Sequence, residues 1–207
     1  MANMDEDAYE YVFVSHCPIE ERGSVRPLRT APCYDRLKGL GAVFGQKFGW
    51  ERANWLAPDG TPQDHHWSFR RSNWFEHVGN EVRHTAEHAG LLDMSAFAKC
   101  RISGPGAAAF MDHLTANKLP KGIGRVSLSH ALTERGGVHS EYTIQREAAD
   151  SFYVVSAGAG QRLDHDWIKK HMPTDGSVRF DNLTNSIGVL VLAGPRARDI
   201  LQKLTRT

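Results

Sequence analysis

The chain of 207 residues lacks the features that mark several large protein classes. It contains no apolar run of the roughly 18 residues that a transmembrane helix needs. Residues 1–8 carry acids and no apolar stretch, unlike a signal peptide and unlike the Arg-rich transit peptides of mitochondria. With 25 Lys and Arg against 24 Asp and Glu, the chain lacks the basic excess of nucleic-acid binders. We therefore expect a globular protein with neither a membrane nor a nucleic acid as its partner.

Cysteine is also scarce, and no Cys-x-x-Cys spacing relates the three that occur: Cys17, Cys33 and Cys100. An odd number without this spacing argues against a disulfide framework and against a zinc cage. Residues 64–66, Asp-His-His, are adjacent in a loop, and His84 and His88 do not form a His-Glu-x-x-His motif. We therefore expect no metal site, and the reducing cytoplasm is the simplest location.

The hydrophobic pattern predicts a mixture of helices and strands that becomes regular from residue 93 onward. Residues 27–55 are rich in glycine and aromatic side chains, which predicts an irregular arm in which a short helix opens at residues 34–38 and is broken by Gly39, Gly41, Gly45 and Gly49. Helices are predicted at 74–88, 105–114, 161–172 and 195–204. Strands are predicted at 9–15, 97–103, 126–133, 138–144, 152–156, 178–180 and 189–192.

Residues 103–115 are echoed by residues 193–205, with Gly, Pro, Ala, Leu and Thr matching in place. Each copy has the pattern of a strand, Gly-Pro and an amphipathic helix. Chance is one explanation, because Gly-Pro is a common helix entry. The other is a duplicated strand–helix–strand unit, in which the second helix lacks the strands that follow the first. On this reading we expect the second helix to expose its apolar stripe and the chain to be cut short.

Several stretches together resemble one family. Residues 27–37 and 41–55, which end in Gly49-Trp-Glu-Arg-Ala-Asn-Trp55, resemble the segment that joins the flavin half to the folate half of dimethylglycine and sarcosine dehydrogenases. Gly90-Leu-Leu-Asp-Met-Ser95, Leu114-Thr-Ala-Asn117 and Glu134-Arg-Gly-Gly-Val-His-Ser-Glu141 are similar to the aminomethyltransferase (glycine-cleavage T-protein) module of that folate half. The resemblance covers residues 25–207.

The resemblance implies an α+β fold, with the ferredoxin-like strand–helix–strand units of a T-protein-like folate-binding module, truncated and preceded by an irregular linker arm. Residues 1–73 would be the leader and linker arm of a missing flavin half, and residues 74–207 the first part of the folate-binding domain. FAD would belong to the missing half, because no Gly-x-Gly-x-x-Gly motif occurs here. The location would be the mitochondrial matrix in a eukaryote.

The implied function is tetrahydrofolate-dependent capture of a one-carbon unit during oxidative demethylation of dimethylglycine or sarcosine. A flavoprotein half or subunit would supply the iminium, which becomes 5,10-methylenetetrahydrofolate. Two alternatives stay open. One is a non-catalytic remnant that docks or regulates, and the other is a folate-dependent demethylase of another substrate, such as a sulfonium compound. Because much of the pocket would be absent, we expect weak folate binding by this chain alone.

The resemblance also assigns roles to individual residues. Glu141 stands where the family has an Asp that closes the hairpin motif, so it would be the acid/base group. Phe97, Leu128 and Ser156 would be pocket walls, with Leu128 at a place where relatives often have an aromatic residue. Each also has a plain structural explanation, as a solvated acid, core residues and a strand cap.

Strand alternation gives a separate argument about the same residues. If Thr133 faces Val138 across the turn, then His130 lies opposite Glu141 and Leu128 opposite Thr143. These four side chains would then share one face of a sheet, where His130 could pair with Glu141 or have no role. A slip of one residue would reverse the prediction.

Overall fold

The structure is a computed structural model that describes residue 23 and residues 26–205. The described residues form two compact units, one containing residues up to Asp93 and from Leu190 onward, the other Met94–Val189. The strand predicted at 9–15 lies outside the described residues. No helix of the described part is both long and apolar enough to cross a bilayer. The boundary predicted at residue 73 concerns a longer protein and stays a prediction.

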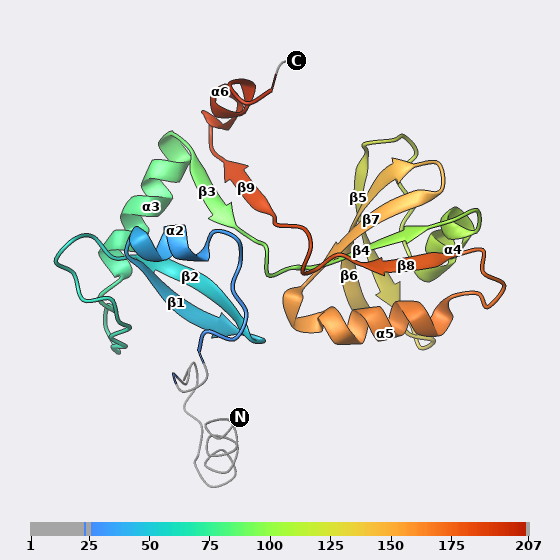
Figure 1. The fold of residues 1–207 in the computed structure, drawn as a ribbon, viewed down its shortest axis with the longest axis horizontal. Coiled ribbons are helices and arrows are strands. Elements are labelled where there is room, and N and C mark those ends of the chain that lie inside the picture. The colour runs from blue at the N-terminus through green and yellow to red at the C-terminus, as the bar shows by residue number, and fades with distance from the viewer. Residues whose placement is uncertain (1–22, 24–25, 206–207) are drawn as a thin grey trace, which may run out of the picture. The chain divides into compact units, whose positions relative to one another are not determined.

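The first unit contains a β-hairpin, a β-ribbon and three helices. The hairpin pairs β1 (Ala42–Lys47) with β2 (Trp50–Leu56), and the ribbon pairs β3 (Gly90–Asp93) with β9 (Leu190–Ala193). The helices are α2 (Tyr34–Gly39), α3 (Phe75–Glu87) and α6 (Ala197–Gln202) (Figure 1). A small core of Val43, Trp55 and Ala57 lies under the hairpin, with Trp74 and Val78 packed against it.

The hairpin corrects the prediction of an irregular arm over residues 27–55. Lys47 lies opposite Trp50, so Phe48 and Gly49 alone form the turn, with φ values of 52° and 82°. Consecutive residues with positive φ are typical of the tight turns that suit twisted antiparallel strands. Gly49 therefore closes a hairpin and does not break the chain into loops.

An ion pair connects the segment before the hairpin to β2. The Arg26 guanidinium donates to both carboxylate oxygens of the buried Glu51, at 2.9 and 2.6 Å.

The second unit is one antiparallel sheet with two helices on one of its faces. The strand order is β5 (Val126–Leu132), β6 (Val138–Ala148), β7 (Ser151–Ser156), β4 (Ala98–Ser103) and β8 (Arg179–Asn182). The helices are α4 (Ala107–Leu114) and α5 (Gln161–His171), and a 3₁₀ turn, η1 (Gly158–Gly160), precedes α5 (Figure 1). The predicted strands and helices of this unit are confirmed, and the mixture confirms the α+β class.

The core of this unit lies between the helices and one sheet face, because every second strand residue points toward them. The fully buried strand residues include Ile102, Tyr142, Ile144 and Phe152, each 0% exposed. The helices contribute an apolar stripe to the same cluster, in α4 Ala107, Phe110, Met111 and Leu114, and in α5 Ile168. The opposite side of the sheet, called the outer face, carries the strand residues that alternate with the buried ones.

The two copies of the repeat share a strand–glycine–helix geometry. Gly104 follows β4 with φ of 115°, and Gly194 follows β9 with φ of 108°. A Cβ at Gly104 would lie 2.5 Å from the Ser177 carbonyl oxygen, and one at Gly194 would lie 2.6 Å from the carbonyl oxygens of Thr85 and His88. Only glycine permits both the dihedral angle and the close backbone approach. The common backbone requirement supports duplication over chance.

The two helices of the repeat differ in burial, as the sequence predicts. In α4, Phe110 and Met111 are 6% and 0% exposed, whereas the matching Ile200 and Leu201 of α6 are 41% and 53% exposed. The ribbon beside α6 also exposes large apolar side chains, with Leu91 at 66% and Leu190 at 52%. The second copy therefore presents the apolar surface that its counterpart buries.

Truncation of a core residue tests the face assignment of β6. Because the Ile144 side chain is fully buried, Ile144→Ala is expected to lower the free energy of unfolding by about 2–5 kcal/mol. The matched control is Val126→Ala on the neighbouring strand, where the side chain is 58% exposed, with an expected change within about 0.5 kcal/mol. Urea unfolding followed by circular dichroism measures both. Equal losses would contradict the assignment.

Candidate active site

The outer face at β5 and β6 brings together the residues that the hairpin argument predicted. His130 lies opposite Glu141, and Leu128 lies opposite Thr143. Directly opposed residues of antiparallel strands point to the same side of the sheet. The intervening Tyr142 is fully buried beneath the helices, while Leu128 is 50% exposed. The shared face is therefore confirmed.

The pairing next to the turn differs from the prediction. Val138 lies opposite Leu132 and not Thr133, because a bulge between Ala131 and Leu132 absorbs one residue. The extra residue is His139 on β6, and the shift of one residue restores the predicted register from Ala131 opposite Ser140 onward. Thr133 instead closes the turn: its amide donates to the Gly137 carbonyl at 2.8 Å, and its hydroxyl accepts from the Gly137 amide at 3.1 Å.

Glu141 and His130 form the polar centre of this face. His130 Nε2 lies 3.2 Å from Glu141 Oε2, and their side chains are 42% and 59% exposed. A carboxylate at this distance can accept a hydrogen bond from the imidazole. Because both groups stay accessible to solvent, the carboxylate can also meet a ligand that lies on the sheet.

A continuous row of side chains crosses the outer face beside this pair. The register places Leu128 opposite Thr143, Thr143 opposite Val155, and Val155 opposite Lys99. The three residues nearest β5 offer aliphatic carbon and one hydroxyl. Such a strip gives a flat ligand apolar contact without the π face that an aromatic side chain would add.

Lys99 is the residue that sequence reasoning passed over. It is 0% exposed, although a lysine side chain is almost never fully buried unless it is paired. Its ammonium donates to the carbonyl oxygens of Ser95 at 2.7 Å and Phe97 at 2.9 Å. A buried ammonium requires such acceptors. Lys99 therefore fixes the bend that leads into β4. In the sequence, its spacing of two residues from Phe97 is the feature that indicates which face of the sheet it lies on.

The other two predicted wall residues lie in different places. Phe97 is half-buried in the bend before β4, at the end of the sheet where His130 and Glu141 pair. Ser156 shares the alternation of Phe152 and Val154, so it lies on the helix-covered face, and it is 8% exposed. The structure thus groups Phe97 and Leu128 with Glu141 and does not bring Ser156 beside them.

An ion pair lies farther along the outer face. Arg101 donates to Glu147 through Nε at 2.6 Å and through a terminal nitrogen at 3.0 Å. Hydrogen bonds from Arg101 hold the pKa of the Glu147 carboxyl below its ordinary value, and the carboxylate in turn raises the pKa of Arg101. Bidentate geometry of this kind orients both side chains.

Cys100 and Tyr142 lie on the helix-covered face, where burial controls their chemistry. Burial, with Asp164 nearby, raises the pKa of the Cys100 thiol to about 12. Burial and Asp164 also raise the pKa of the Tyr142 hydroxyl. A thiol that stays protonated is a poor nucleophile, so Cys100 acts as a small core residue. Within the described part of the chain, no cluster of three His, Cys, Asp or Glu residues could hold a metal ion.

The model of the GCVT N-terminal domain family matches residues 33–207. The chain belongs to this family. Mouse mitochondrial dimethylglycine dehydrogenase is 36% identical over 201 residues, which are 96% of this chain and 23% of that protein. The mouse mitochondrial pyruvate dehydrogenase phosphatase regulatory subunit is 32% identical over 185 residues, 87% of this chain and 21% of that protein.

The fold of the GCVT N-terminal domain is also recognisable among solved structures. The aminomethyltransferase T of the glycine cleavage system from Bartonella henselae aligns with a TM-score of 0.66 and 24% identity. The alignment covers 85% of this chain and 43% of that one. The chain therefore spans less than half of that structure and under a quarter of the two mouse relatives. The T-protein-like fold predicted from the sequence is confirmed.

The Arg101–Glu147 pair predicts a pH dependence of stability. Because the folded pKa of Glu147 is depressed, its contribution is complete above the unfolded value of about 4.3 and is lost as pH falls through the folded pKa. Glu147→Gln is expected to cost about 0.5–1 kcal/mol at pH 7, since solvent screens the partly exposed pair. The difference from wild type should shrink steadily below pH 4, as measured by urea unfolding.

The control for this measurement is Glu134→Gln in the exposed hairpin turn, a carboxylate for which no ion pair is found among the residues that the structure describes. Its difference from wild type should stay near zero at every pH. A Glu147→Gln difference that stays constant down to about pH 2 would show that the pair contributes nothing through the charge of Glu147.

Proposed function

We propose that these residues form the first part of a tetrahydrofolate-binding module that captures a one-carbon unit released by oxidation of an N-methylamine. The donor would be of the dimethylglycine or sarcosine type, and an FAD-containing half or subunit of a longer protein would oxidise it. The observation that carries the proposal is the exposed Glu141 carboxylate beside an apolar strip of the outer face, in a chain of this family.

The residues of the outer face fit a reduced pterin in their chemistry. A pterin is flat, with apolar faces and hydrogen-bonding edges. Leu128 and Val155 offer aliphatic contact for a face, and Phe97 lies at the end of the sheet where Glu141 is found. The carboxylate of Glu141 and the ring of His130 offer an acceptor and a donor for an edge. Ser156, which lies on the helix-covered face, does not face a ligand on this side of the sheet.

Folate, when bound, would supply the N5 nucleophile that forms a bond to the iminium carbon. Overall, an iminium and tetrahydrofolate give methylenetetrahydrofolate and a protonated amine, so the reaction moves protons without releasing one. Glu141 would accept a proton from folate nitrogen and return it to the departing amine. Its negative charge would also stabilise the cationic centre before transfer. His130, hydrogen-bonded at 3.2 Å, would orient the carboxylate.

The partners and the location follow from the same proposal. The flavin would be held by a part of a longer protein that these residues do not represent, as the short coverage of the relatives allows. The matrix of mitochondria is the location for a eukaryotic chain, because the dimethylglycine dehydrogenase relative carries that description. The cytoplasm is the location for a bacterial chain.

A regulatory or docking role is the second candidate. One relative with substantial identity is named a regulatory subunit of a phosphatase. In that case the outer face of the sheet would be a retained surface without chemistry, and Glu141 would be a solvated acid. The two candidates differ in what they require of this carboxylate.

Replacement of Glu141 separates the candidates. In the longest natural polypeptide that contains these residues, Glu141→Gln is expected to lower the rate of methylenetetrahydrofolate formation by about 10²–10⁴. Uncaptured iminium would hydrolyse to formaldehyde, so the readout is the ratio of the two products with dimethylglycine or sarcosine as donor. Reduction of the flavin by the amine should not change.

The control variant is Glu134→Gln, an equivalent charge loss in the exposed turn of the same hairpin, which should leave the product ratio unchanged. An unchanged ratio in Glu141→Gln would contradict the acid/base role. Absence of both products in the wild type, with the polypeptide intact, would favour the regulatory candidate.

A further inference from the structure

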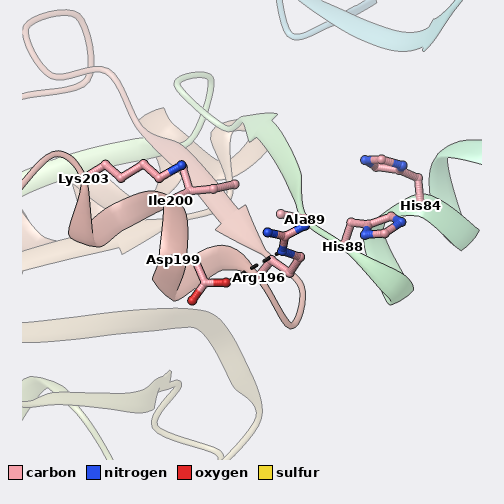
Figure 2. Close-up of a pocket in the computed structure, with 7 residues that line it drawn as sticks. All are labelled: His84, His88, Ala89, Arg196, Asp199, Ile200 and Lys203. Carbon is pink, nitrogen blue, oxygen red and sulfur yellow. Dashed lines mark ion pairs between the residues drawn. The ribbon is translucent and has the colours of Figure 1, made fainter.

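A hollow in the first unit is lined by none of the residues of the outer face and plays no part in the proposed function. It has a volume of about 380 Å³ and lies between the C-terminal end of α3 and the helix α6 (Figure 2). Its polar lining consists of His84 in α3, His88 directly after α3, and Arg196, Asp199 and Lys203 from the segment after β9.

The backbone holds the two sides of this hollow together. The Arg196 amide donates to the His88 carbonyl at 2.8 Å. Gly194, with positive φ, lets the chain pass against the last turn of α3, where any Cβ would lie 2.6 Å from the carbonyl oxygens of Thr85 and His88. The close approach of Gly194 to α3 and the hydrogen bond between Arg196 and His88 therefore hold the two sides of the hollow together through the backbone.

The charge of the lining favours an anion. Asp199 is the single acid among the lining residues, and it already pairs with Arg196 at 3.7 Å. No ion pair is found for Lys203 within the described residues. Two cationic side chains and two imidazoles thus share a hollow with one carboxylate, and each of the four can donate to an oxyanion.

The two imidazoles are arranged as a pair. His84 and His88 are one helical turn apart, and their ring centroids lie 4.8 Å from each other with the rings tilted by 45°. Neither ring has a hydrogen-bond partner among the described side chains and backbone groups. Metal coordination is a poor explanation for the pair, because the described residues offer no third ligand.

We propose that this hollow binds a small oxyanion, a phosphate or carboxylate group, through Arg196, Lys203 and the paired imidazoles of His84 and His88. The ligand bridges α3 and α6 and neutralises the excess positive charge of the lining. Phosphate esters and carboxylic acids share this chemistry, so the test includes both.

The test is titration of the 207-residue chain with inorganic phosphate and, separately, with succinate, at constant ionic strength. Histidine ring signals are followed by nuclear magnetic resonance, with assignments from His84→Gln and His88→Gln. Saturable shifts confined to these two rings are expected, with dissociation constants of about 1–10 mM. The anion that binds more tightly identifies the ligand class, and chloride should give no saturation.

Two matched variants distinguish the hollow from general surface charge. Arg196→Ala is expected to weaken binding about tenfold, while Arg198→Ala, two residues further on in α6 but outside the lining, should change it less than about twofold. Lys203→Ala is a second test should Arg196→Ala disturb α6. Absence of saturable shifts for both anions, or equal weakening by the Arg198 variant, would overturn the proposal.

Discussion

The antiparallel pairing of β5 and β6 is the constraint on which the candidate site depends. Tyr142 and Ile144 are fully buried beneath the helices, and this burial fixes which face of β6 points inward. Every alternate residue, including Glu141, must then point outward, and the register places it opposite His130. A shift by one residue would bury the carboxylate and expose the core. The hydrophobic core therefore determines the position of the polar site on the opposite side of the sheet.

Much of the second unit could be predicted from the sequence because its strands alternate and its helices carry apolar stripes. Counting from the hairpin turn gives the correct pairing of Leu128 with Thr143 and of His130 with Glu141, although Val138 pairs with Leu132 beside a bulge. Counting residues across a turn cannot detect a bulge, and here the extra residue on β6 offsets the different pair at the turn, so the outer pairs match the prediction. The burial of Lys99 was not predictable either, because its acceptors are backbone carbonyl oxygens in a bend.

The first unit was less predictable, for reasons that lie in its glycines. Glycine is common in loops, so the glycine-rich stretch over residues 27–55 predicts irregular structure. In the structure Gly49 forms the turn of a hairpin, and Trp55 is buried in its small core. The repeat was more informative, because Gly104 and Gly194 serve the same strand-to-helix turn. The placement of Ser156 on the helix-covered face follows from its alternation with Phe152 along β7, and a family resemblance in motifs carries no information about this face.

The proposal that folate lies on the outer face of the sheet can be tested by methyl-group resonances in the presence of tetrahydrofolate. Neighbouring residues on β7 provide a matched pair, since Val155 points to the outer face and Val154 is buried beneath the helices. The account predicts that tetrahydrofolate shifts the methyl signals of Leu128 and Val155 while those of Val154 and Ile144 stay in place. Shifts confined to the helix-covered face, or none at saturating folate in the full natural polypeptide, would contradict it.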